Sequence, residues 1–362
     1  MNILFVSHLM ADVSAGPSWS VPASVDSLSK LDNVLWVNTT GEEMPHWKKV
    51  KAFYSMDKKT KLSLNAIPKE FGMPDIVIFE GLYDSFKEIL FAKELRRNSI
   101  PYIIVPRGSL TYKAMHDYSH IKKVIAHKLF YDRYIDGAKS IQYLTKEEYE
   151  DSKYRYGKQY FILPNGFYTP IKKKEQFCQN GINALYIGRI DINHKGLDIL
   201  VEACGGAAET LRRNQFKLSL YGPKTKDWFE IKKMVQSKNI EDFVSVFGPV
   251  SGVEKENALL NADLFVMTSR FEGHPMGLIE ALAYGLPCLV SDGTNMADSV
   301  EEYNAGWTCK ADVSSTRQAL CAFIKEKDML RQKGENALKL SQQYDWSKLA
   351  MDLHNQIERL LG

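Results

Sequence analysis

Short apolar runs bounded by polar or turn residues recur along the whole chain. In the first half they are NILFVS, NVLWVN, DIVIFE, YIIVP, SIQYLT and YFILPNG, and in the second half NALYIG, FKLSLYG, VSVFG, ADLFVMTS and PCLVSD. Near-continuous hydrophobicity is typical of strands that are buried on both faces of a sheet, and helical stretches lie between most of these runs. The pattern therefore predicts two α/β domains, each a doubly wound parallel sheet of the Rossmann-like kind.

The length of 362 residues also favours two domains, since a domain usually holds about 150 residues, and two domains imply a cleft. The polar, lysine-rich stretch IKKKEQFCQNG separates the two sets of runs, and we place a linker at about Pro170 to Asn180. We predict an N-terminal domain over 1–170, a C-terminal domain over 171–345 and a final helix over 346–362. One side of that helix is apolar, with Trp346, Leu349, Leu353, Ile357 and Leu360.

The composition is that of a globular protein, with 44% hydrophobic residues, 25% charged residues and a formal net charge of +3. This basicity is too weak for a dedicated nucleic-acid binder, so we expect no nucleic-acid partner, but it suits anionic ligands. Lysines from Lys48 to Lys61 are interleaved with Trp47, Phe53 and Tyr54. Such a cluster is compatible with peripheral contact with an anionic membrane, and equally with a solvated loop and helix face.

The five cysteines form no C-x-x-C pair, so neither a disulfide framework nor a zinc site is indicated. The N-terminal stretch MNILFVSHLM lacks the basic region of a signal peptide and indicates a buried first strand. No apolar run reaches the roughly 18 residues of a transmembrane helix. We expect a cytoplasmic protein, either free or at the inner face of the membrane.

The segment LYIGRIDINHKGLDILVEA places two cations, Arg189 and Lys195, between a strand and an apolar helix. Ligands of open α/β sheets bind at the carboxyl ends of the strands, and two cations beside a helix N-terminus suit a diphosphate. The alternative is that both are solvated loop residues. No Asp-x-Asp sequence occurs and His194 lacks a spaced His or Cys partner, so we expect no metal and neutralisation of the diphosphate by these cations.

A second segment, SRFEGHPMGLIEALAYGLPCLVSD, joins two buried strands through a loop and a helix. Pro275 suits the first helical turn, where the amides of Met276, Gly277 and Leu278 would be free to bind an anion. Glycines at 273 and 277 would let a ligand approach the backbone closely.

Two glutamates of this segment can bind one ligand. Glu272 on the loop can contact a sugar in front of the helix, and Glu280 within the helix can accept hydrogen bonds from vicinal ribose hydroxyls. A glutamate pair with seven residues between its members is a weak signal, and its specificity comes from the surrounding string FEGHPMGLIEALAYGLP.

At these residues the sequence resembles the retaining glycosyltransferases of glycosyltransferase family four, whose two-Rossmann architecture is called GT-B. The matching parts cover almost the whole chain and include GRI…HKGLDIL, VSVFGPV, the E-x7-E segment, LPNGF and the closing YDWSKLA. The resemblance implies two domains that face each other across a cleft, and a final helix that crosses back to pack on the N-terminal domain.

The resemblance also implies roles for individual residues. Glu272 would contact the sugar of the donor, Glu280 would hold the nucleotide ribose, and Arg189 and Lys195 would bind the diphosphate. The donor site as a whole would add Gly16, Gly248, Val250, His274, Pro275, Met276, Gly277 and Leu278, with the backbone from Gly248 to Val250 at the base.

The match is weaker in the N-terminal domain. The loop SAGPSWSVPASV has Gly16 alone where a glycine pair is commoner. Two interpretations of this loop are open: it contacts ligands, or it is only a strand-to-helix turn. Relatives with a PHG form place a cleft histidine where this chain has Arg107. An arginine cannot act as a general base, but it can bind phosphate or the acceptor, and His116 and Asp117 are alternative candidates for the base.

We therefore predict a retaining, metal-independent, hexosyltransferase-type enzyme with Glu272, Arg189, Lys195 and Arg107 as catalytic residues. Its donor would be a nucleotide-diphosphate sugar, its acceptor a sugar or lipid-linked sugar in cell-surface polysaccharide or glycolipid assembly, and it would need no cofactor. In front-face transfer the departing phosphate could accept the hydroxyl proton, stabilised by the cations and helix amides.

Three other functions compete with this prediction. An inactive GT-B subunit that binds nucleotide-sugar is the main alternative, supported by the missing cleft histidine. A nucleotide-sugar epimerase is less favoured, because the FEGHPMGLIEALAYGLP string is typical of transferases. A nicotinamide oxidoreductase is disfavoured, because no G-x-G-x-x-G follows the first strand.

Overall fold

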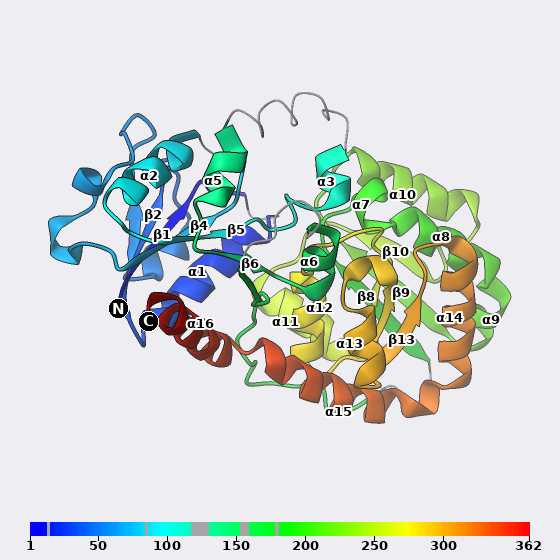
Figure 1. Cartoon of the computed structure of the whole chain (residues 1–362). Helices are drawn as coiled ribbons and strands as arrows, with labels where there is room; N and C mark the ends of the chain where they lie inside the picture. The colour runs from blue at the N-terminus through cyan, green and yellow to red at the C-terminus, as the bar shows by residue number, and fades with distance from the viewer. Residues whose placement is uncertain (13–14, 84–85, 117–129, 153–158, 178–180) are drawn as a thin grey trace. The chain divides into compact units, whose positions relative to one another are not determined.

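The computed structural model describes residues 1–12, 15–83, 86–116, 130–152, 159–177 and 181–362 (Figure 1). The chain divides into two compact units: unit 1 is Met1–Gly166 with Trp346–Gly362, and unit 2 is Phe167–Asp345. Each unit holds one parallel sheet, as the apolar runs predict. The division falls after Gly166 and not after residue 170, and the final helix belongs to unit 1.

Unit 1 is built on a sheet with the strand order β3-β2-β1-β4-β5-β6-β7. Its strands are β1 (Asn2–Ser7), β2 (Asn33–Asn38), β3 (Phe53–Ser55), β4 (Ile76–Glu80), β5 (Tyr102–Val105), β6 (Ser140–Tyr143) and β7 (Tyr160–Ile162). Its described helices include α1 (Pro17–Leu28), α2 (Phe86–Arg97), α3 (Tyr112–His116), α5 (Asp132–Asp136), α6 (Lys146–Ser152) and α16 (Trp346–Leu361). Chain order reverses between β1 and β4, so the ligand-binding switch point lies at the carboxyl ends of these strands.

Helix α16 packs against α1 within unit 1. The buried side of α16 is the predicted one, with Trp346, Leu349, Leu353, Ile357 and Leu360 in one core with Val21, Val25 and Leu28 of α1. The period of apolar residues thus predicts which side of the helix is buried, whereas its partner α1 lies more than 300 residues earlier in the chain.

The lysine and aromatic cluster of unit 1 contains both a buried and an exposed aromatic residue. Trp47 is fully buried, and its ring meets that of Trp36 edge-on with 5.6 Å between centroids. Tyr54 remains 38% exposed. The prediction that Trp47 contacts headgroups is wrong, because a large aromatic ring gains most from burial in the core. Among the described residues, no helix is long and apolar enough to span a membrane.

Unit 2 is built on a sheet with the strand order β10-β9-β8-β11-β12-β13. Its strands are β8 (Ile182–Ile187), β9 (Phe216–Tyr221), β10 (Val244–Phe247), β11 (Leu264–Met267), β12 (Cys288–Ser291) and β13 (Gly306–Cys309). Its described helices include α7 (Ile192–Lys195), α8 (Leu197–Gly206), α9 (Ala208–Arg213), α10 (Lys226–Ser237), α11 (Gly252–Asn261), α12 (Met276–Ala283), α13 (Ala297–Glu302), α14 (Val313–Lys325) and α15 (Leu330–Ser341). Here the switch point lies between β8 and β11.

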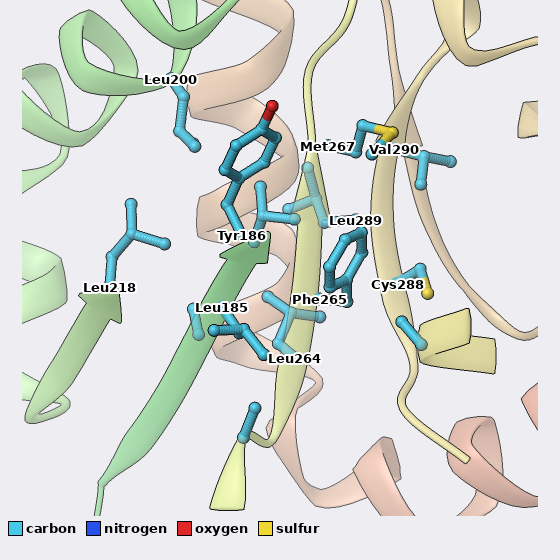
Figure 2. Packing of buried hydrophobic residues seen from close by; sticks show 14 of the residues in the cluster. Leu185, Tyr186, Leu200, Leu218, Leu264, Phe265, Met267, Cys288, Leu289 and Val290 are labelled. Carbon is cyan, nitrogen blue, oxygen red and sulfur yellow. The ribbon is translucent and has the colours of Figure 1, made fainter. Parts of the chain in front are cut away.

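The core of unit 2 surrounds the central strands of its sheet. Figure 2 shows Leu185 and Tyr186 of β8 beside Leu264, Phe265 and Met267 of β11. All four residues of β11 and all four of β12 are buried, which explains why these strands appear in the sequence as continuous apolar runs.

The segment predicted as a linker is anchored to unit 2 in its described part. Lys174 is almost fully buried, with its Nζ atom 3.1 Å from Asp263 Oδ1, and its backbone amide donates to Tyr284 O at 2.8 Å. In its described part, the segment predicted as a linker at about Pro170 to Asn180 therefore belongs to unit 2. A lysine-rich composition favours exposure, but a buried carboxylate such as Asp263 can hold a lysine in the interior.

Candidate functional site

The carboxyl end of β8 carries the first predicted cation. Arg189 lies 3.4 Å, Nη2 to Oδ2, from Asp191, and its side chain is 46% exposed. Asp191 also caps α7, since its Oδ1 accepts from the His194 amide at 2.8 Å. Arg189 is thus an exposed cation at the switch point of unit 2, available to an anion from solvent.

The second predicted cation lies against the first glutamate. Lys195 Nζ is 2.6 Å from Glu272 Oε1, and the same oxygen accepts from Ser269 Oγ at 2.6 Å. The side chains of Lys195 and Glu272 are only 16% and 10% exposed. The structure therefore brings together two residues that the sequence placed on separate segments.

A partly exposed arginine that the sequence analysis did not single out joins these segments. Arg270 binds both carboxylate oxygens of Asp198 at 2.8 and 2.7 Å and donates to Ile192 O at 2.6 Å. Gly196 has a φ of +58°, and a Cβ there would lie 2.2 Å from Thr268 O. The turn between α7 and α8 therefore requires glycine, and it fixes Lys195 beside the loop after β11.

The start of α12 offers fewer free amides than predicted. Leu278 N donates to Pro275 O at 3.0 Å, so the prediction that its amide is free is wrong, because the first turn tightens to an i to i+3 bond. Within the described part of the chain, the amides of Met276 and Gly277 have no hydrogen-bond acceptor. Gly277 packs closely, since a Cβ there would lie 3.0 Å from Ile187 O, whereas the space at Gly273 is open.

The second glutamate is paired with a lysine that the sequence did not single out. Lys255 Nζ of α11 binds Glu280 Oε2 of α12, and the two side chains are 30% and 12% exposed. Burial raises the pKa of Glu280 above its ordinary value, and the charge of Lys255 opposes that rise. Glu280 is therefore a nearly buried carboxylate whose charge depends on its lysine.

His274, predicted in the donor site, is only 8% exposed. Its ring centroid lies 5.2 Å from that of Tyr344, and burial lowers the pKa of His274 to about 3. This histidine is therefore neutral at physiological pH. The half-buried His194, whose ring meets Phe271, also has a lowered pKa because of burial and the neighbouring Lys195.

The comparison with protein families decides the identity of unit 2. Residues 168–340 match the family described as "Glycosyl transferases group 1". This part of the chain is a glycosyl transferases group 1 domain. It contains Arg189, Lys195, Glu272 and Glu280 together with the start of α12.

Curated relatives of the glycosyltransferase domain are similar over part of their length. Mannosylfructose-phosphate synthase of Agrobacterium fabrum is 32% identical over 123 residues, which are 33% of this chain and 27% of that protein. Poly(glycerol-phosphate) alpha-glucosyltransferase of Bacillus subtilis is 25% identical over 219 residues, 57% of this chain and 30% of that protein. The chain thus spans less than a third of the length of these two relatives.

Solved structures share the fold over almost the whole chain. Sucrose-phosphate synthase of Thermosynechococcus elongatus has a TM-score of 0.73 and 17% identity, covering 99% of this chain and 98% of its own. Anabaena Alr3699/HepE in complex with UDP has a TM-score of 0.75 and 13% identity, covering 99% and 100%. These likenesses bear out the GT-B fold of two Rossmann-like domains.

The predicted base-binding loop of the glycosyltransferase domain follows β10. Gly248 and Val250 lie between β10 and α11, whose first turn carries Lys255. Helix α10 is hydrogen-bonded to the residue before this loop, because Trp228 Nε1 donates to Phe247 O at 2.8 Å. Lys255, the partner of Glu280, lies about one helical turn after Val250 in the chain.

Outside the glycosyltransferase domain, the two predicted residues of unit 1 have structural partners. Gly16 precedes α1 with a φ of −52°, which any residue can adopt, and its carbonyl accepts from the amides of Trp19 and Ser20 at 3.0 Å each. Gly16 therefore lies in the turn before α1, in a backbone conformation that does not require glycine.

Arg107 is held within a polar network of unit 1. Its Nε and Nη2 atoms each lie 2.8 Å from Glu80 Oε2, and its Nη1 atom donates to Ser20 Oγ at 3.2 Å and Asn165 Oδ1 at 3.3 Å. Its side chain is only 13% exposed and that of Glu80 only 4%. The guanidinium of Arg107 is thus bound to other side chains of unit 1, whereas that of Arg189 is exposed to solvent. Among the alternative bases, Asp117 and the side chain of His116 lie outside the described part of the chain.

Proposed function

We propose that this protein transfers a sugar from a nucleotide-diphosphate sugar to an acceptor hydroxyl. The observation that carries the proposal is the Lys195–Glu272 pair at the switch point of unit 2, with Arg189 and the open amides of Met276 and Gly277 on the neighbouring segments. Cations and free amides together bind a diphosphate, and a carboxylate beside them binds sugar hydroxyls.

The proposed donor extends along α12. The diphosphate lies against Arg189, Lys195 and the first amides of the helix, while Glu272 contacts the sugar. Glu280, eight residues further on, accepts hydrogen bonds from the ribose hydroxyls, and the base lies at the loop from Gly248 to Val250. The pairing of Glu280 with Lys255 supports this role, because the lysine keeps the nearly buried carboxylate charged.

The proposed transfer retains the configuration at the anomeric carbon and uses no metal. The acceptor oxygen forms its bond on the face from which the diphosphate departs, and the nucleoside diphosphate leaves with the electron pair of the broken bond. Arg189, Lys195 and the helix amides stabilise the charge that develops on the leaving group. The hydroxyl proton passes to an oxygen of that leaving group, so no enzyme nucleophile takes part.

The acceptor is a sugar or lipid-linked sugar in the assembly of cell-surface polysaccharide or glycolipid, with the protein in the cytoplasm or at the inner face of the membrane. Support comes from the names of similar proteins, which include a poly(glycerol-phosphate) alpha-glucosyltransferase and a phosphatidyl-myo-inositol mannosyltransferase. A hexose is the transferred sugar in this proposal. UDP is the nucleotide to test first, because a HepE structure of the same fold contains it.

A catalytically inactive subunit is the second candidate. The observation that favours it is the network around Arg107, which occupies the position of the histidine in family relatives with a PHG form. Such a subunit would bind nucleotide-sugar and transfer nothing.

One experiment separates the two candidates. UDP-glucose, UDP-N-acetylglucosamine and GDP-mannose are screened for thermal stabilisation of the protein, and release of the nucleoside diphosphate is then followed with sugar acceptors. Stabilisation with turnover supports the transferase, and stabilisation without turnover on any acceptor supports the inactive subunit. An Arg189→Ala variant that transfers sugar at the wild-type rate would overturn the assignment of the diphosphate site.

A further inference from the structure

We infer that His8 binds a hydroxyl group of the acceptor through its Nε2 atom. The inference rests on the proposed function and adds to it an acceptor contact in unit 1. His8 follows β1 directly, at the carboxyl end of the strand where chain order reverses. Polar side chains at this position of an open α/β sheet are placed to meet a ligand.

The register of the sheet gives His8 a fixed neighbour. Strands β1 and β2 pair with Ser7 opposite Asn38, so His8 and Thr39 follow side by side. His8 Nδ1 lies 2.8 Å from Thr39 Oγ1, and Thr39 is fully buried. A buried partner restrains the orientation of the half-buried imidazole ring.

The hydroxyl group of Thr39 determines which ring nitrogen carries the proton. Thr39 Oγ1 satisfies both of its contacts only by donating its one hydrogen to Ser7 O at 3.0 Å and accepting from His8 Nδ1 at 2.8 Å. His8 Nδ1 must therefore be the protonated nitrogen, and in the neutral ring the lone pair lies on Nε2. Within the described residues, Nε2 has no hydrogen-bond partner.

The surroundings of His8 favour the neutral ring. Burial lowers the pKa of His8, the charges of Lys87 on α2 and Lys58 after β3 lower it further, and Glu42 after β2 opposes them. The neutral imidazole leaves Nε2 as a hydrogen-bond acceptor at physiological pH. Sugar hydroxyls are hydrogen-bond donors and match such an atom.

The loop beside His8 is held rigidly. Asn38 is fully buried, its Oδ1 accepts from Leu9 N at 2.8 Å, and its Nδ2 donates to Leu9 O, Thr40 Oγ1 and Glu42 O at 3.0, 2.9 and 3.1 Å. These bonds join the ends of β1 and β2. A preorganised acceptor atom binds a hydroxyl without the entropy loss of ordering a loop.

His8 also supplies a property that Arg107 lacks. A guanidinium only donates hydrogen bonds, and that of Arg107 is already bound to Glu80, Ser20 and Asn165. The hydroxyl that His8 binds is not the attacking hydroxyl, whose own proton leaves with the diphosphate in the proposed mechanism. His8 therefore orients the acceptor and takes up no proton.

The test compares His8→Asn with wild type. An asparagine amide can occupy the place of Nδ1 and keep the bond to Thr39, but it has no counterpart of Nε2. With UDP-glucose, UDP-N-acetylglucosamine or GDP-mannose as donor and methyl α-glycosides of glucose, galactose, mannose and N-acetylglucosamine as acceptors, we expect His8→Asn to lower kcat/KM for the acceptor at least about tenfold. The affinity for UDP, measured by calorimetry, stays unchanged.

His354→Asn is the matched control. His354 is also a partly buried histidine of unit 1, but its Nδ1 lies 2.7 Å from Asp32 Oδ2. Asp32 precedes the amino end of β2, whereas His8 follows the carboxyl end of β1. We expect its kcat/KM for the acceptor to equal that of wild type.

Imidazole nitrogen NMR gives a readout that does not depend on activity. We expect a protonated Nδ1 and an unprotonated Nε2 for His8 at pH 7. A protonated Nε2, or transfer by His8→Asn at the wild-type rate, overturns the inference while the proposed function stands. A wild-type protein that binds no nucleotide-sugar and transfers no sugar overturns the proposed function, and the acceptor role of His8 with it.

Discussion

Lys195 Nζ lies 2.6 Å from Glu272 Oε1, so the cation assigned to the diphosphate and the carboxylate assigned to the sugar are bound to each other. Both side chains are mostly buried, at 16% and 10% exposure. Each charge is therefore part of the other's environment, and removal of one leaves the other poorly compensated. The two residues act as a unit.

We predict that Lys195→Met and Glu272→Gln have effects on transfer that are not additive. Each single variant should lower kcat/KM for the nucleotide-sugar by about 100-fold, because charge stabilisation in the transition state is lost. The double variant should be little worse than either, because residues in contact couple. Steady-state kinetics of wild type, both single variants and the double variant measures the coupling. A loss of kcat/KM in the double variant equal to the product of the two single losses would contradict the prediction.

We predict that Glu280→Gln weakens nucleotide binding without loss of stability. Burial raises the pKa of Glu280, so folding disfavours its charged form, and that unfavourable contribution develops as the pH rises from the ordinary pKa of a glutamate to the raised pKa. A neutral glutamine of the same shape removes it. At pH 7.5 the melting temperature should be unchanged or higher, while affinity for UDP in calorimetry falls about tenfold. Affinity equal to wild type would remove Glu280 from the ribose site.

We predict a pH-dependent stability that originates from His274. Its pKa is about 3 in the folded protein and near the ordinary 6.5 when unfolded, so between these values only the unfolded state binds the proton. Stability therefore falls as the pH drops from 6.5 towards 3. Between pH 6 and 4, urea unfolding of wild type should weaken by up to about 1.4 kcal/mol per pH unit more than that of His274→Gln. Parallel curves for the two proteins would show that the ring is not held neutral.

We predict that Arg107→Met destabilises unit 1. The substitution leaves the nearly buried Glu80 without its cation, which costs about 3 kcal/mol. Adding Glu80→Gln should restore part of the loss, because the uncompensated charge is then absent. Chemical unfolding measures both effects, and UDP affinity serves as the control because it should not change. An Arg107→Met protein as stable as wild type would instead favour a direct role with ligands.

Much of the fold follows from local pattern. The apolar runs predict parallel strands because such strands are buried on both faces, and β11 and β12 are buried along their whole length. The apolar side of α16 follows from the helical period of its apolar residues, because residues three or four apart lie on the same side of a helix. Segment order along the chain also placed Arg189 and Glu272 at carboxyl ends of strands, where the sheet leaves room for a ligand.

The sequence by itself determined which residues carry charge near the site, and the tertiary structure decided which of them bind one another. Lys195 and Glu272 are 77 residues apart, and Arg107 meets Glu80 across 27 residues. Trp47 is in the core and Lys174 is buried, although a lysine-rich composition favours exposure of both. His8 and Thr39 are neighbours only because β1 and β2 pair in one register. Such pairings depend on which strands lie next to each other in the sheet, and local hydrophobic period contains no information about that order.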